Sequence, residues 1–68
     1  MSLQITVNGE ARTVPDSATL ADLVIALGEA PQSLATAVNG DFVPREARVQ
    51  CLLRDGDEVF TFQPITGG

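Results

Sequence analysis

The group in this sequence best suited to chemistry is the α-carboxylate that follows Gly67 and Gly68. Glycine has no side chain and no preferred sign of φ, and terminal residues without anchoring contacts are typically disordered. A Gly-Gly end can therefore enter a narrow channel and present its carboxylate to a second protein. Taken alone, the two glycines fit this role no better than they fit chance or an appended segment, so the residues before them must decide between function and coincidence.

Cys51 is the second candidate, and it is the single cysteine of a chain that has no histidine. The chain therefore cannot assemble a zinc site, an internal disulfide, or a Ser-His or Cys-His nucleophile, and no metal site is expected. Arg48 and Arg54 each lie three residues from Cys51, and a nearby arginine can lower the pKa of a thiol. Free cysteine is nevertheless among the most buried residue types, which favours packing over reactivity.

Three acids close together, Asp55, Asp57 and Glu58, are the third candidate. Paired carboxylates can act as general acid and base. Acids around a glycine are far more typical of a solvated turn, and their charge would repel the phosphate that a glycine-rich loop usually holds. We therefore expect a protein without enzymatic activity of its own.

Composition and charge restrict the class of protein. With 68 residues and 44% hydrophobic residues, the chain is expected to form one small domain over residues 1–66, followed by a flexible tail at 67–68. The net charge of −5, without any lysine, argues against nucleic acid and anionic membranes as partners. It is compatible with a basic protein partner or with solubility alone. One cysteine, no apolar stretch of membrane length and no signal peptide favour the cytoplasm.

Local patterns predict a β-β-α-β-β-β order, an α+β class in which one helix covers one face of a mixed sheet of four to five strands. Apolar residues alternate over residues 3–7, Asn8-Gly9 indicates a tight hairpin turn, and residues 10–14 return as the second strand. Thr19 and Asp22 resemble a capping box, which predicts the start of the helix. The apolar stripe of this helix and its glycine stop are Leu20, Leu23, Val24, Leu27 and Gly28.

The second half of the chain predicts the remaining strands. Residues 34–38 are apolar enough for an interior strand, Asn39-Gly40 indicates a turn, and residues 42–43 form a short strand closed by proline. Residues 45–50 are either irregular or a single helical turn. The last strand covers residues 58–63, after the acidic turn.

The last strand is apolar on both faces, with Val59 and Thr61 on one and Phe60 and Phe62 on the other. A single helix can cover only one of these faces. We expect the two phenylalanines, together with Pro64 and Ile65, to form an exposed strip that binds a partner and leads to Gly68.

Taken together, the element order, the Asp-Gly-Asp turn, the aromatic last strand and the Gly-Gly end resemble the ubiquitin-like β-grasp sulfur carriers. Within that group, the segment from Val38 to Glu46, Val-Asn-Gly-Asp-Phe-Val-Pro-Arg-Glu, resembles the ThiS family of thiamine biosynthesis. The resemblance covers essentially the whole chain. One departure is that the family often has an aromatic residue shortly after Val-Pro-Arg, where this chain has Ala47, Arg48 and Val49. Another is that the last strand also resembles the small subunit of molybdopterin synthase, which is usually longer.

The resemblance implies that this protein is a co-substrate that binds no cofactor itself. A ThiF-type adenylating enzyme would use MgATP to activate the Gly68 carboxylate, a persulfide donor would convert it to a thiocarboxylate, and thiazole synthase would accept the sulfur. Val59 corresponds in the resemblance to a core-facing position, which supports an outward Phe60 and Phe62. The alternatives are a molybdopterin synthase subunit and a ubiquitin-like protein modifier.

Overall fold

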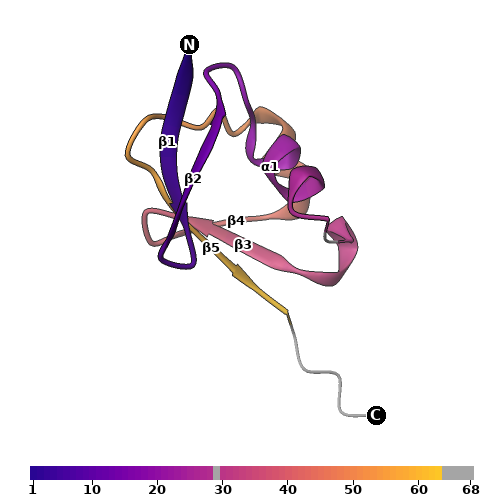
Figure 1. Ribbon diagram of the computed structural model, residues 1–68. Coiled ribbons are helices and arrows are strands. Elements are labelled where there is room, and N and C mark those ends of the chain that lie inside the picture. The colour runs from indigo at the N-terminus through magenta and orange to yellow at the C-terminus, as the bar shows by residue number, and fades with distance from the viewer. Residues whose placement is uncertain (29, 64–68) are drawn as a thin grey trace.

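The computed structural model describes residues 1–28 and 30–63, which form a five-stranded sheet with one α-helix on one side (Figure 1). The order of the strands across the sheet is β2-β1-β5-β3-β4, and the sheet is mixed because β1 and β5 run parallel. The expected α+β class and the mixed sheet of four to five strands are therefore confirmed. The strands are β1 (Ser2–Val7), β2 (Glu10–Pro15), β3 (Ala35–Val38), β4 (Asp41–Val43) and β5 (Glu58–Phe62).

The hairpin of β1 and β2 turns at Asn8-Gly9, as the sequence predicts. Both residues adopt positive φ, 52° for Asn8 and 87° for Gly9, which is the conformation that a type I′ turn requires. The antiparallel register runs from Ser2 opposite Pro15 to Val7 opposite Glu10. Strand β1 therefore has β2 on one side and β5 on the other, which places the first strand inside the sheet.

Helix α1 (Leu20–Ala26) begins with the predicted capping box. The Thr19 side chain accepts a hydrogen bond from the Asp22 amide, and the Asp22 side chain accepts one from the Thr19 amide. These two bonds satisfy amides that the first turn of a helix leaves without partners. No helix among residues 1–28 and 30–63 is long and apolar enough to cross a membrane.

The core lies between α1 and the covered face of the sheet. Its fully buried side chains come from the helix stripe and from the inward positions of β1 and β5. They include Ile5, Leu20, Leu23, Val24 and Val59. Leu27, the last residue of the predicted stripe, is partly buried against this cluster, and Gly28 follows at φ 77° as the expected helix stop.

The second half of the chain contains two short 3₁₀ helices, η1 (Pro31–Ser33) and η2 (Arg45–Gln50). The second one resolves the two alternatives for residues 45–50 in favour of a helical segment. The β3–β4 turn at Asn39-Gly40 repeats the geometry of the first turn, with Asn39 at φ 53°. The observed strands match the predicted ones to within one residue at each end.

Candidate functional site

The tail residues predicted to carry the chemistry, Gly67 and Gly68, lie outside the described residues, as do Pro64 and Ile65. What the structure shows is the strand that leads to them. Strand β5 lies in the middle of the sheet, between β1 and β3, and its pairing with β3 extends to Phe62. The tail therefore follows directly from a strand that is held on both sides over its first half.

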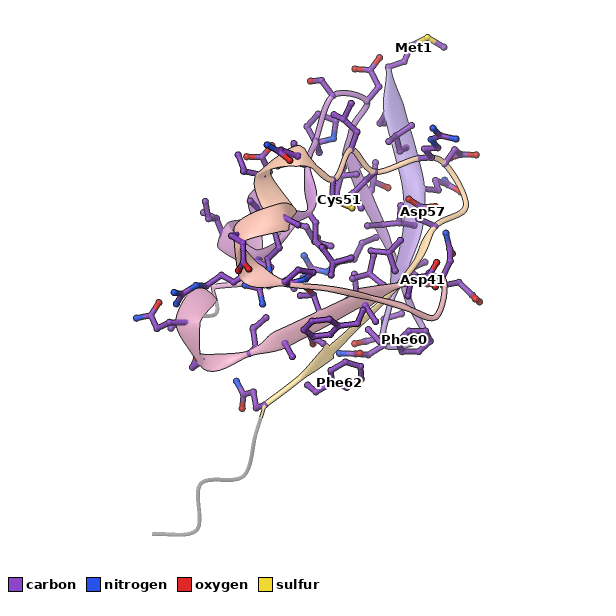
Figure 2. All side chains as sticks on the ribbon, turned by 180° about the vertical axis from the view of Figure 1, so that it is seen from behind. Met1, Asp41, Cys51, Asp57, Phe60 and Phe62 are labelled. Atoms are coloured by element: carbon purple, nitrogen blue, oxygen red, sulfur yellow. The ribbon has the colours of Figure 1, made fainter. Side chains whose placement is uncertain are left out.

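Phe60 and Phe62 lie on the side of the sheet away from α1, as the sequence predicts (Figure 2). Phe60 retains 39% of its side-chain exposure and Phe62 retains 50%, whereas Val59 between β1 and β3 retains none. Two large aromatic side chains on the solvated side of a sheet leave apolar area in water, which is typical of a surface that binds a partner.

The strand register adds Phe42 of β4 to this surface. Ala37 of β3 lies opposite Phe42 on one side and opposite Phe60 on the other, and Ala35 lies opposite Phe62. Residues directly opposite one another in a sheet point to the same face. We refer to this surface as the aromatic face, and its members are Ala35, Ala37, Phe42, Phe60 and Phe62.

The sequence analysis missed Phe42 because no local pattern says which strands become neighbours. Phe42 is 66% exposed, and Ala37 between the two flanking rings is only 8% exposed. Because the alanine side chains of β3 are small, the phenylalanines of the two neighbouring strands project beyond them on this face. The aromatic face is thus wider than the strip along β5 predicted from the sequence.

Each Asn-Gly turn also binds β5 through its asparagine side chain. The Asn8 amide oxygen accepts a hydrogen bond from the Thr61 backbone amide at 3.0 Å, and its nitrogen donates to Thr61 Oγ1 at 2.9 Å. At the other end of the strand, the Asn39 oxygen accepts from the Glu58 amide at 3.0 Å, and its nitrogen donates to Asp57 Oδ1 at 3.0 Å. These contacts link residues that are 18 to 53 positions apart in the chain.

The acidic turn before β5 is structural. Asp55 Oδ1 accepts a hydrogen bond from the Gln4 backbone amide at 2.8 Å, and Asp57 Oδ2 accepts one from the Arg54 amide at 2.8 Å. Carboxylates that accept backbone amides in this way fix a turn and dock it on β1. The preference for a turn over an acid/base pair is confirmed for Asp55 and Asp57.

Cys51 packs against the edge of the core and is half-buried. Burial raises the pKa of its thiol above the ordinary value, and the negative charge of Asp57 acts in the same direction. Because the thiolate is the reactive form, the thiol is held in its unreactive state at neutral pH. The prediction that Cys51 is a packing residue is confirmed.

Arg48 is a residue whose role the sequence analysis missed, since it was considered only as a neighbour of Cys51. Its side chain is 3% exposed, and burial, followed by the positive charge of Arg45, lowers the pKa of the guanidinium. Its Nε donates to Thr36 Oγ1 at 3.0 Å, and its Nη2 donates to the Leu34 carbonyl at 2.6 Å. Arg48 therefore joins η2 to the segment from Leu34 to Thr36 by hydrogen bonds that are themselves buried.

Among residues 1–28 and 30–63 we find neither a ligand-sized pocket nor a cluster of three metal-binding side chains.

Comparison with known proteins identifies the family. The ThiS family model matches residues 5–68. The sulfur carrier protein ThiS of Escherichia coli (strain K12) is 35% identical over 66 residues, which cover 97% of this chain and all of that protein. The crystal structure of the thiamine biosynthesis protein ThiS from Geobacter metallireducens superimposes with a TM-score of 0.83 at 32% identity, over 97% of this chain and all of that one.

A more distant structure supports the fold alone. The crystal structure of SAMP1 from Haloferax volcanii has a TM-score of 0.62 at 19% identity, with all of both chains covered. The fold is accordingly the ubiquitin-like β-grasp expected from the sequence. From the family match, the near-complete coverage and the shared architecture, we conclude that the chain belongs to the ThiS family of sulfur carrier proteins.

Proposed function

We propose that this protein carries sulfur for thiamine biosynthesis as a thiocarboxylate on Gly68, and that the aromatic face docks it on its partner enzymes. The observation that supports this most directly is the position of β5. The same strand presents Phe60 and Phe62 to solvent and continues toward Gly67 and Gly68. A partner that binds the aromatic face therefore meets the chain end a few residues away.

The chemistry requires two activation steps by partner enzymes. A ThiF-type adenylating enzyme uses MgATP to convert the Gly68 carboxylate to an acyl adenylate and releases pyrophosphate. A persulfide donor then attacks the acyl carbon through its terminal sulfur and displaces AMP, which leaves an acyl disulfide. A second thiol attacks the sulfur of the donor, so that the donor leaves as a mixed disulfide and the Gly68 thiocarboxylate is released. Thiazole synthase accepts this sulfur.

The carrier supplies placement and not catalysis. An acyl adenylate reacts readily with any nucleophile, including water, so the partner must receive the tail in a defined position. The pairing of β5 with β1 and β3 holds the aromatic face in place. With nine acids against four basic residues in the chain, a partner with basic residues around an apolar surface is favoured. The cytoplasm, where MgATP is available, is the proposed location.

The aromatic face is also compatible with a molybdopterin synthase subunit or a protein modifier, and the product at Gly68 separates the three. Intact mass spectrometry after incubation with the adenylating enzyme, MgATP and a persulfide donor is expected to show one oxygen exchanged for sulfur. A purified thiazole synthase should then remove the sulfur and restore the original mass. Conversely, an isopeptide bond to other proteins indicates a modifier, and transfer only to a molybdopterin synthase catalytic subunit indicates the second alternative.

Two matched variants control this experiment. A chain that lacks Gly68 should retain its thermal unfolding midpoint and gain no sulfur, because terminal residues without anchoring contacts contribute little to stability. A chain with one residue added after Gly68 should behave in the same way. Sulfur incorporation into either variant contradicts a reaction at the Gly68 carboxylate.

A further inference from the structure

The two Asn-Gly turns have the same sequence and the same backbone geometry, yet they hold opposite ends of β5. Asn8 and Asn39 have φ values of 52° and 53°. The Asn39 side chain binds the amide of Glu58, the first residue of the strand, whereas the Asn8 side chain binds Thr61, one residue before its end. The molecule therefore contains two similar anchors, of which only one lies beside the segment that leads to the tail.

The position of Asn8 matters because β1 ends early. The parallel pairing of β1 with β5 covers only Thr6 with Glu58 and Val7 with Val59, followed by the hydrogen bond from the Asn8 amide to the Val59 carbonyl. In a longer β1, the next backbone carbonyl would accept the Thr61 amide. Here the side-chain oxygen of Asn8 accepts the hydrogen bond from the Thr61 amide instead. Its amide nitrogen adds a second bond to Thr61 Oγ1, so this side chain continues the ladder where the strand stops.

We propose that Asn8 is a positioning residue for the carrier reaction: by holding Thr61, it fixes the direction in which β5 delivers Phe62 and the chain beyond it to the adenylating enzyme. The inference rests on the proposed function and goes beyond it by assigning two tasks to different residues: binding the enzyme, and orienting the end of β5 in the bound state. Phe60 and Phe62 supply docking contacts. Asn8 contributes none of these and limits how widely the end of β5 swings once the carrier is bound. If the end of β5 loses this orientation, a smaller fraction of the bound carriers has its Gly68 carboxylate within reach of ATP.

The test uses Asn8→Gly, with Asn39→Gly as the matched control. Glycine adopts positive φ without strain, so both turns keep their backbone and lose only the side-chain amide. In steady-state adenylation, measured as pyrophosphate release, we expect Asn8→Gly to lower kcat by about three- to tenfold with KM changed by less than about twofold. Asn39→Gly should change both constants by less than about twofold, although it removes the same number of hydrogen bonds.

Rescue and hydrogen exchange separate positioning from general loss of structure. Asn8→Asp should restore kcat, because a carboxylate accepts the Thr61 amide and the Thr61 hydroxyl can rotate to donate to it. Exchange of the Thr61 amide should accelerate in Asn8→Gly but not in Asn39→Gly, and the reverse should hold for Glu58. If Asn8→Gly does not fold, Thr61→Val removes the bond to Thr61 Oγ1 with little change in shape and should give a smaller loss of kcat.

An equal loss of kcat in both glycine variants overturns the proposal, as does an effect on KM alone or an unchanged kcat in Asn8→Gly. Failure of the proposed function gives a different result. In that case the adenylating enzyme releases no pyrophosphate even with the carrier that has no substitution. In that case the exchange rates of Thr61 and Glu58 still decide whether Asn8 holds the end of β5.

Discussion

The two faces of β5 differ in a way that side-chain size does not predict. Val59 is completely buried, whereas the larger Phe60 next to it is 39% exposed. A phenylalanine buries more apolar area than a valine and would stabilise the core more. Helix α1, however, covers the face on which Val59 lies, and alternation along the strand turns Phe60 and Phe62 to the other. The covered face therefore stabilises the fold, and the aromatic face is available for binding.

The inner face should show the largest loss of stability. Val59→Ala is expected to lower the free energy of unfolding by about 2 kcal/mol or more, because Val59 lies at the centre of the core and its neighbours cannot fill the space. Urea denaturation measures this change. Binding of the folded fraction to the adenylating enzyme should stay within about twofold of the original. A binding defect at temperatures where the variant is fully folded would show that the two faces are not independent.

The buried polar contact on the inner face gives the next largest effect. Thr36 has no exposed surface, donates to the Val43 carbonyl at 2.9 Å and accepts from Arg48 Nε. Thr36→Val keeps the shape but removes both bonds, and leaving buried groups unsatisfied costs about 1–3 kcal/mol. Thermal or urea unfolding tests this, with Thr13→Val on the exposed edge strand β2 as the control. If Thr36→Val lowers the free energy of unfolding by less than the control does, Arg48 has found another hydrogen-bond partner.

On the aromatic face, a substitution should weaken partner binding more than it lowers the free energy of unfolding. Phe62→Ala is expected to cost well below the roughly 3–5 kcal/mol of a core phenylalanine. It should weaken binding to the adenylating enzyme by about tenfold, a typical loss for an aromatic anchor at an interface. Isothermal titration and urea unfolding on the same protein give both numbers.

Ile25→Ala is the matched control for this comparison, because Ile25 is 69% exposed on the helix. It should leave binding unchanged. If Phe62→Ala unfolds the protein without a separate binding defect, or if Ile25→Ala weakens binding as much, the docking surface lies elsewhere.

The smallest effect concerns Cys51 at the border of the core. Its raised pKa means that the folded protein keeps the thiol proton at pH values where the unfolded chain begins to lose it. Stability should therefore be unaffected below the ordinary thiol value of 9.0 and should decrease as the pH rises above it. Alkylation with iodoacetamide at pH 7.5 should be slower in the folded protein than in urea. Equal rates would place the thiol in solvent.

Much of this arrangement follows from local sequence. The alternation in β1 and β5, the capping box at Thr19 and the two Asn-Gly turns predict the elements to within a residue, because each depends on residues close together in the chain. The outward direction of Phe60 and Phe62 also followed, from the presence of one helix and the family correspondence at Val59. The chemistry assigned to Gly68 stays a prediction.

What local sequence could not supply is the pairing of distant segments. Phe42 joins the aromatic face only because β4 lies beside β3 and β3 beside β5. The burial of Arg48 depends on Leu34 and Thr36, which lie 14 and 12 positions earlier in the chain. Arginine is usually exposed, so no single-residue preference predicts it inside. The side-chain bonds of Asn8 and Asn39 to β5 are likewise properties of the assembled sheet.

The parallel contact of β1 with β5 also has a consequence for how the molecule folds. Thr6 and Glu58 are partners in the sheet although 52 positions separate them (58 − 6). The β1–β2 hairpin needs only local closure and can form first, whereas β5 must wait for a large loop to close. Because β5 is the middle strand of the sheet and Val59 on it has no exposed surface, it is expected to open only when the whole domain unfolds. Docking and the core should therefore be lost together in one cooperative transition.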